Sequence, residues 1–284
     1  MTEQAQGDTR NVLFRVRRYN PEKDSEPYFQ DFRVPVTKGM VVLEGLWYIK
    51  EHLDPTLAWR ASCRMGVCGS CGMLVNGRPM LACNSQIGDV GGDVLVVAPL
   101  PNFGIVRDLV PDLMGMFETH KELMPYIQRA DQEEMLEPTE QYWQSAEELE
   151  EYLQFSYCIK CGCCMAACPV VATDPKYSGP QPLAQGYRFL IDSRDGGFAE
   201  RKQKLAGEAG PWRCHYAGEC SAVCPKGVDP ARAIQLMKRQ LVLDYLHLGK
   251  LSCRKPAPVM RPDQKRGLRE GIPDPPPFTV EGAK

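Results

Sequence analysis

The sequence has no apolar run that approaches the roughly 20 residues a helix needs to cross a bilayer. It has no excess of basic residues either, since 34 Lys and Arg residues stand against 36 Asp and Glu residues. Nucleic-acid binding usually needs a basic surface, so this balance gives no reason to expect it. Residues 1–10 lack the apolar core of a signal peptide and the Arg- and Ser-rich bias of a transit peptide. These absences predict a cytoplasmic protein that would serve a membrane only through partners.

Side chains that carry out substrate chemistry are also scarce. The chain has four histidines, and glycine-rich segments such as Gly91-Gly92 lack a phosphate-loop pattern. Nothing in the sequence suggests a catalytic base, a nucleophile or a nucleotide-binding loop. We therefore expect any substrate chemistry to take place on another subunit.

Cysteine, by contrast, is abundant, with 13 residues in a chain of 284. A disulfide framework is typical of small secreted chains, and this chain is neither small nor visibly secreted. In a reducing compartment, clustered cysteines are used instead to bind metal. The chain is also long enough for two domains of ordinary size.

The fold class expected is α+β, and residues 10–110 are expected to contain the sheet. In chain order the predicted elements are a hairpin, an amphipathic helix, a cysteine-rich loop and three short strands, at residues 11–36, 42–53, 61–72, 72–75, 80–83 and 94–97. Asn76-Gly77 is a good tight-turn pair between the first two short strands. This order resembles the β-grasp of plant-type ferredoxins.

The second half predicts an all-α domain at 140–249 that resembles bacterial ferredoxins, reached through a partly helical connector at 111–139. Its longest helix is expected at 231–248, entered through Asp229-Pro230 and stopped by Gly249. The tail at 250–284 is rich in proline and cannot form regular helix or sheet. We expect this tail to pack on a partner subunit.

The first cysteine group has the spacing C-x4-C-x2-C, with one more cysteine after 11 residues. Its members are Cys63, Cys68, Cys71 and Cys83. This is the plant-type spacing for a [2Fe–2S] cluster, whose two irons need a larger loop than one zinc ion does. Small residues fill the loop and let backbone N–H groups turn toward the sulfurs. A zinc site is the alternative, but zinc motifs usually place cysteines as separated C-x2-C pairs.

The second cysteine group spells C-x2-C-x2-C-x3-C-P and consists of Cys158, Cys161, Cys164 and Cys168, followed by Pro169. In this bacterial ferredoxin run the fourth cysteine ligates the other cluster, so a partner run is expected. The chain supplies one, which consists of Cys214, Cys220 and Cys224, followed by Pro225.

Alignment of the two runs shows that the partner run has lost one ligand. Ala217 stands where the first run has Cys161, and alanine cannot bind iron. With crossed fourth cysteines, the set of four thiolates, which predicts a [4Fe–4S] cluster, is Cys158, Cys161, Cys164 and Cys224. The set of three thiolates is Cys168, Cys214 and Cys220. Because a cubane with an unligated corner readily loses that iron, this second set predicts a [3Fe–4S] cluster.

Two cysteines remain outside these sets. Cys163 lies between ligands and is expected to pack as a small apolar residue. Cys253 lies in the tail and looks incidental.

Zinc knuckles and redox disulfides are the alternatives for the two ferredoxin-like runs. Two runs of this spacing, one of which lacks a single ligand, favour two iron–sulfur clusters instead. Three clusters on one chain would carry electrons between other redox centres.

The order of the three clusters resembles the iron–sulfur subunit of succinate:quinone oxidoreductases. Further stretches that agree with this family are Arg18-Tyr19-Asn20-Pro21, SCRMGVCGSCG at 62–72, Arg107-Asp108-Leu109, RFLIDSRD at 188–195 and CPKGVDP at 224–230. The likeness covers about residues 11–245 and leaves the tail outside.

The resemblance implies a flavoprotein subunit that interconverts succinate and fumarate on FAD. Electrons would pass through [2Fe–2S], [4Fe–4S] and [3Fe–4S] to a quinone at one or more membrane-anchor subunits. The N-terminal domain would face the flavin, and the C-terminal domain would sit on the anchor. The chain would then be a peripheral protein on the cytoplasmic side of a bacterial inner membrane.

The quinone pocket of this family is built partly on the iron–sulfur chain, beside the third cluster. The resemblance points to five candidate residues, which are Pro169, Thr173, His215, Gln235 and Lys238. For Lys238 the alternative is an ordinary solvated lysine on a helix face. Ubiquinone-using members carry a tryptophan where this chain has Thr173, which favours menaquinone.

Two other functions compete with this one. A subunit of a thiol-linked or heterodisulfide-type reductase would carry further cysteine-rich motifs, whereas the tail has only Cys253. A soluble electron carrier is usually small and acidic, whereas this chain has a net charge of -2 over 284 residues.

Overall fold

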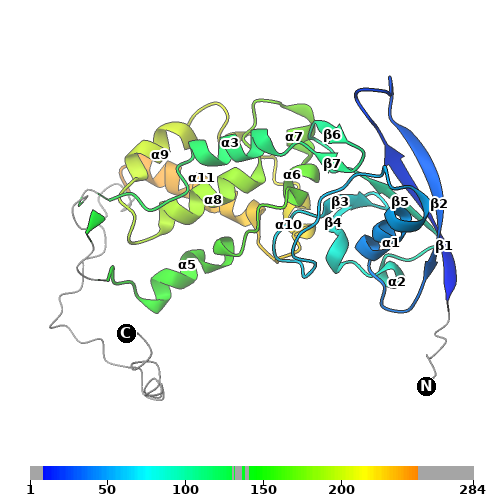
Figure 1. The fold of residues 1–284 in the computed structure, drawn as a ribbon. Coiled ribbons are helices and arrows are strands. Elements are labelled where there is room, and N and C mark those ends of the chain that lie inside the picture. The colour runs from blue at the N-terminus through cyan, green and yellow to red at the C-terminus, as the bar shows by residue number, and fades with distance from the viewer. Residues whose placement is uncertain (1–8, 130, 132–135, 138–140, 249–284) are drawn as a thin grey trace, which may run out of the picture.

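The structure is a computed structural model that describes residues 9–129, 131, 136–137 and 141–248. The predicted tail and Cys253 lie outside the described residues, as does Gly249. Two parts of the chain lie side by side, one built on a sheet and one on helices (Figure 1). None of the described helices is both long enough and apolar enough to span a membrane.

The first part is built on a five-stranded mixed sheet with the order β2-β1-β5-β3-β4. Its strands are β1 Arg10–Arg18, β2 Tyr28–Val36, β3 Gly72–Val75, β4 Arg78–Leu81 and β5 Val94–Ala98. β1 and β2 form the predicted antiparallel hairpin, and β5 pairs parallel with β1 and antiparallel with β3. In β1, Val12, Phe14 and Val16 alternate with more exposed residues, so one face of the sheet is apolar.

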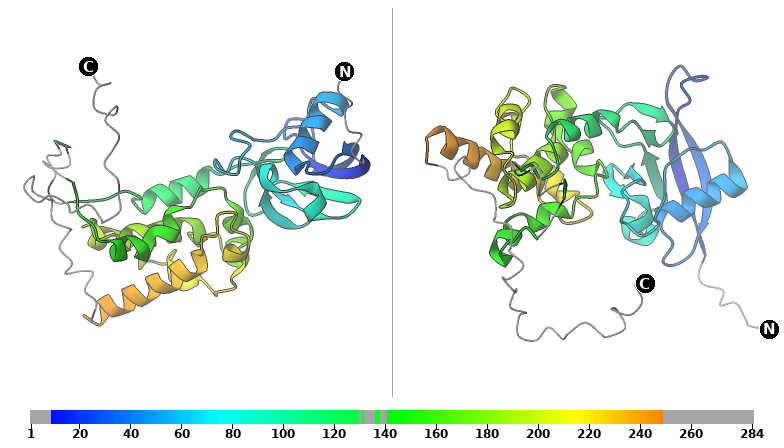
Figure 2. Two further views of the ribbon diagram at one scale, coloured as in Figure 1. Left: turned by 90° about the horizontal axis from the view of Figure 1, so that it is seen from below. Right: turned by 60° about the vertical axis from the view of Figure 1, so that its left-hand side comes forward.

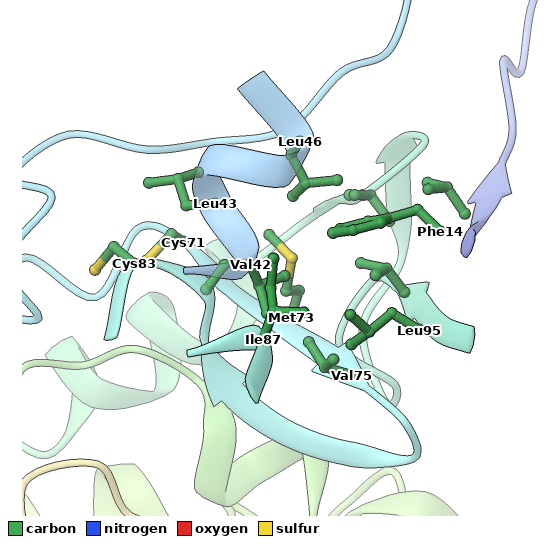
Figure 3. Close-up of a cluster of buried hydrophobic side chains, with 14 of the residues drawn as sticks. Phe14, Val42, Leu43, Leu46, Cys71, Met73, Val75, Cys83, Ile87 and Leu95 are labelled. Carbon is green, nitrogen blue, oxygen red and sulfur yellow. The ribbon is translucent and has the colours of Figure 1, made fainter. Parts of the chain in front are cut away.

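One helical segment covers this apolar face. It comprises α1 Val42–Tyr48 and a π-helical turn, η1 Ile49–Leu53. Its buried side chains meet those of the sheet in the core that Figure 3 shows. A Cβ at Gly45 would lie 2.3 Å from the Phe14 ring, so only glycine lets the helix approach the sheet this closely. Cys71 and Cys83 lie beside Leu43 at one end of the core (Figure 3).

One short turn differs from a strand that the sequence predicts. β4 ends at Leu81, and Cys83 falls in the 3₁₀ turn η2 Ala82–Asn84 instead of in the strand predicted at 80–83. Ala82 still donates its N–H to the carbonyl of Cys71, and the chain then turns so that the Ser85 hydroxyl donates to the Leu81 carbonyl at 2.9 Å. The short helix α2 Ile87–Val90 follows, and a two-stranded ribbon of β6 Ile105–Arg107 and β7 Val110–Pro111 ends this part.

The second part is helical over the residues that the structure describes after Pro111. Its elements are α3 Met114–Glu122, α5 Ala146–Ser156, α6 Cys163–Ala166, α7 Pro169–Thr173, α8 Pro180–Ile191, α9 Phe198–Leu205, η3 Pro211–Arg213, α10 Glu219–Ala222 and α11 Pro230–Tyr245. The buried helix α8 lies at the centre, in contact with α3, α5, α9 and α11 (Figures 1 and 2). Cysteines stand at or near the starts of α6, α7 and α10, as expected for loops that hold clusters.

The longest helix begins where the sequence predicts. The Asp229 carboxylate accepts the N–H of Arg232, and Pro230 occupies the first turn. The helix ends at Tyr245, three residues before the predicted end, because the chain turns at His247, which has a φ of +54°.

The two parts are joined by direct contacts between their loops. The Asn102 amide donates to the carbonyls of Met165, Ala166 and Cys168. A Cβ at Gly69 would lie 2.9 Å from the carbonyl oxygen of Ile159, and a Cβ at Gly72 would lie 2.9 Å from that of Cys161. The first cysteine loop therefore packs backbone to backbone on the start of the second.

Candidate functional site

The first cysteine loop turns backbone N–H groups toward its sulfurs. Cys63 Sγ accepts N–H groups of Met65, Val67 and Cys68 at 3.4, 3.3 and 3.2 Å. On the other side of the loop, Cys83 Sγ accepts the N–H of Gly66 at 3.2 Å. Gly66 has a φ of +68°, which turns its N–H inward at little steric cost. Such donors stabilise the thiolate form of cysteine, which is the form that binds iron.

The thiols of this loop differ in acidity. N–H and hydroxyl groups of Cys63 and Ser70 lower the pKa of Cys68 to about 6. Burial and the neighbouring Cys83 raise the pKa of Cys71 to about 12. Metal binding by Cys71 would therefore release a proton at neutral pH.

The second group of cysteines lines a hollow of about 400 Å³, a volume that includes the part open to solvent. The cysteines in its wall are Cys158, Cys161, Cys164 and Cys224. Apolar residues fill the wall between them, and Lys226 and Gln181 are its polar members. Cys224 reaches this hollow from a segment some 60 residues after the other three, as the crossed pattern predicts.

The thiols of the second hollow lie in a mostly apolar wall. Burial raises the pKa of Cys158 and of Cys224, and it raises that of Cys164 strongly. A hydrogen bond from Cys163 lowers the pKa of Cys161 to about 7.

The third group lines a separate hollow of about 320 Å³. Its cysteines are Cys168, Cys214 and Cys220. Ala217 also lies in the wall and offers a methyl group where the aligned run has a cysteine. Burial raises the pKa of Cys220 to about 11, and burial near these thiols raises the pKa of Tyr177. This hollow therefore has three sulfur donors and a fourth side without one.

The sets of thiols described above suit iron–sulfur clusters better than single metal ions. Within the described part of the chain, no three His, Cys, Asp or Glu side chains are placed to hold one metal ion. A single zinc needs all its sulfurs within about 2.3 Å of one point. In the two hollows, three and four thiols are instead spread around the wall of a pocket. The donor chemistry and the hollows together fit the predicted iron–sulfur clusters.

Cys163 is fully buried and is not in the wall of either hollow. It belongs to the apolar core of the first part of the chain, which also contains Cys71 and Ala166. Its environment therefore agrees with the expectation that it is a packing residue.

The structure brings four of the five quinone candidates to the third hollow. Pro169 and His215 line it. Gln235 Nε2 lies 3.9 Å from Cys214 Sγ, and Lys238 Nζ donates to the Cys214 carbonyl at 2.9 Å. Lys238 is half-buried and bonded, so its side chain is not that of a fully solvated lysine.

Thr173 is placed differently from the other four. It is exposed at the end of α7, and its hydroxyl donates to the Pro169 carbonyl at 3.0 Å. Its side chain is thus turned to its own helix and does not line the third hollow.

Several polar residues at these hollows could not be identified from the sequence. Gln181, on α8, lines the second hollow, and Tyr177 lines the third. Neither stands at a characteristic distance from a cysteine in the sequence. Their positions follow from tertiary packing, Gln181 at the start of α8 and Tyr177 in the loop just before it.

Comparison with known families defines the class of protein. Residues 13–118 match a 2Fe-2S iron-sulfur cluster binding domain, and residues 154–228 match a 4Fe-4S dicluster domain. The chain is thus an iron–sulfur protein of two domains, the first carrying the first cysteine group and the second carrying the other two.

Individual relatives identify the family. The chain is 47% identical over 229 residues to the fumarate reductase iron-sulfur subunit of Mycobacterium tuberculosis, with 80% of this chain and 91% of the relative covered. It is 39% identical over 238 residues to the mitochondrial succinate dehydrogenase [ubiquinone] iron-sulfur subunit of Candida glabrata, with coverages of 81% and 91%. A chain of the Mycobacterium smegmatis Sdh1 complex in the apo form superposes with a TM-score of 0.72 at 29% identity, over 84% of this chain and 98% of that one. The chain belongs to the family of iron–sulfur subunits of fumarate reductases and succinate dehydrogenases.

Proposed function

We propose that this chain carries electrons between the FAD of a flavoprotein subunit and a quinone at a membrane anchor. Its sites would hold [2Fe–2S], [4Fe–4S] and [3Fe–4S] clusters. The observation that carries the proposal is the crossed arrangement of the thiols. Four line one hollow and three line the next, and each hollow takes one cysteine from the other run. Iron–sulfur clusters accept and release single electrons when bound.

The ligand sets proposed are those of the sequence analysis. The first loop supplies Cys63, Cys68, Cys71 and Cys83; the second hollow supplies Cys158, Cys161, Cys164 and Cys224; the third supplies Cys168, Cys214 and Cys220. Backbone N–H groups of the first loop favour the thiolate form of its cysteines, and the walls of the other two hollows are mostly apolar.

The packing of the chain supports one order of transfer. The first loop touches the second cysteine run through Gly69 and Gly72, where a side chain would collide with backbone. The second and third hollows are lined by neighbouring cysteines of the same two runs, with Cys164 and Cys168 on one run and Cys224 and Cys220 on the other. An electron would therefore move between neighbouring sites in the order first, second, third, or in the reverse order.

Finer assignments belong to the same proposal. The first domain would be a β-grasp ferredoxin domain at 10–110, and the second a bacterial-ferredoxin-like domain at 140–249. The chain would lie on the cytoplasmic side of a bacterial inner membrane, with the third hollow toward the anchor. Exposed Tyr216 beside that hollow and exposed Trp212 nearby support an apolar partner there.

Pro169, His215, Gln235 and Lys238 would form this chain's share of the quinone pocket, with Thr173 at its edge. The absence of tryptophan at Thr173 favours menaquinone. Ubiquinone as the sole lipid quinone extracted with the complex would overturn this last assignment.

The test uses the complex that co-purifies with this chain from its native membrane. We expect it to oxidise succinate with added quinone, to reduce fumarate with a low-potential quinol, or to do both. The ratio of the two rates would show which direction the complex favours. A complex with intact clusters and neither activity would mean that the chain serves some other dehydrogenase.

A further inference from the structure

Gln181 is a buried polar residue that belongs to none of the ligand sets. It is the second residue of α8 and is 1% exposed. Its side chain lines the second hollow together with the four cysteines there. A buried glutamine in a mostly apolar wall needs a reason, because burial of an amide costs free energy unless it is hydrogen-bonded.

The amide nitrogen of Gln181 lies between a sulfur and an imidazole. Nε2 is 4.0 Å from Cys158 Sγ and 3.3 Å from His120 Nδ1. A primary amide has two N–H groups, so one can point at each neighbour. The sulfur decides the orientation of the amide, since an oxygen in that place would face the negative charge of a thiolate.

His120 is suited to hold the amide in this orientation. It is 8% exposed, and burial together with the charge of Lys160 lowers its pKa to about 4. A neutral imidazole can leave Nδ1 free to accept the second N–H of Gln181.

The other end of the amide has no partner within the described residues. Gln181 Oε1 is buried without a hydrogen bond. Leaving a buried acceptor unsatisfied costs about 1–3 kcal/mol, so such an atom needs an explanation, and a redox role is one. Gln185, one turn further along α8, has a different partner, because its amide donates to the Phe155 carbonyl at 2.8 Å.

We propose that Gln181, oriented by His120, donates an N–H to Cys158 and raises the reduction potential of the cluster held in the second hollow. This inference presupposes the proposed function, in which that hollow holds a [4Fe–4S] cluster. Reduction adds one electron, which comes from a neighbouring cluster site, and it breaks no bond. The amide keeps both hydrogens. Because a donor at the sulfur stabilises the more negative, reduced form, it favours reduction. Gln181 is thus a positioning residue that sets the driving force between neighbouring sites.

The experiment is a redox titration of the purified complex, with each cluster followed by its EPR signal. In Gln181→Leu we expect the reduction equilibrium of the second cluster to fall about tenfold, which for one electron is about 59 mV. The first and third clusters should keep their potentials. The control is Gln185→Leu, which removes another buried glutamine from the same helix and should leave all three potentials unchanged. An unchanged second potential in Gln181→Leu, or an equal fall in the control, would overturn the inference.

A measurement on the unaltered complex covers the case in which Gln181→Leu does not assemble. With ¹⁵N in the glutamine side chains, the reduced second cluster should show a hyperfine coupling to an amide nitrogen. Its absence in the wild-type complex would overturn the inference without any variant. A wild-type complex that lacks a [4Fe–4S] signal altogether would instead refute the proposed function, so the two failures are distinguishable.

Discussion

Replacement of Arg18 by methionine tests how far the first domain depends on a buried ion-pair network. Arg18 lies at the end of β1, and its side chain is 6% exposed. Its guanidinium contacts Asp54 at 2.6 Å and Asp108 at 3.1 Å. Asp108 also accepts the N–H groups of Tyr19 and Ala58 at 3.0 and 2.9 Å. The network therefore ties the first hairpin to the chain on both sides of the cysteine loop.

The size of the effect follows from burial. Removal of one partner of a buried ion pair costs about 3–5 kcal/mol, because the other charge stays behind. The Asp108 side chain is 3% exposed, and its only other cation among the described residues is Arg107, 3.9 Å away. Asp54 is 17% exposed, so water can partly replace the contact that its carboxylate loses with Arg18. We therefore expect the free energy of unfolding to fall by about 3 kcal/mol, the lower end of this range. In a domain of about 100 residues that is a fall in Tm of about 12–24 °C.

The assay is thermal loss of the visible circular dichroism of the [2Fe–2S] site in the full-length, cluster-loaded chain. Arg15→Met is the matched control on the same strand. Arg15 pairs with Asp31 at 2.9 Å, but the two side chains are 47% and 42% exposed. Exposed pairs contribute little, so this variant should melt close to the wild type. Equal melting temperatures for the two variants would refute the argument from burial.

Three further predictions concern the cluster sites and the acid stability of the first domain. Ala217→Cys adds a fourth thiol to the third hollow, and the EPR signal of oxidised [3Fe–4S] should disappear; a retained signal would count against the three-thiolate site. Burial alone would raise the pKa of Asp54, but hydrogen bonds from Thr56 and Arg18 outweigh it and lower the pKa to about 2. The stability that Asp54 adds is thus complete above its ordinary pKa of 3.8 and is lost as pH falls through about 2. Acid unfolding of Asp54→Asn should lack this step, and an identical acid profile would contradict it. Lys238→Met should raise the KM for quinone while the EPR signals of all clusters stay unchanged; an altered third-cluster signal would point instead to a purely structural role through the Cys214 carbonyl.

Local patterns predicted much of this fold because they report local physics. Alternating Val and Phe residues gave the hairpin β1–β2, and Asn76-Gly77 adopts positive φ at both residues, as a tight turn of this kind requires. Cysteine spacing predicted which thiols meet, including the crossing of Cys168 and Cys224. That crossing could be predicted because, in this motif, the fourth cysteine of each run ligates the other cluster.

The features that the sequence did not predict depend on contacts between distant segments. The ribbon β6–β7 is too short for any periodicity. The Arg18–Asp108 pair joins residues 90 positions apart, and nothing in either neighbourhood marks the other. Gln181 reaches the second hollow because α8 packs on α6 of the first run and lines the hollow together with Cys224 of the other run. Long-range packing of this kind has no local signature.

The most direct test of the account is EPR spectroscopy of the wild-type complex, oxidised in air and then reduced. We predict an oxidised [3Fe–4S] signal at first, followed on reduction by separate [2Fe–2S] and [4Fe–4S] signals, each equal in amount to the chain. The absence of the [3Fe–4S] signal, or the presence of zinc in place of iron in either half of the chain, would contradict it.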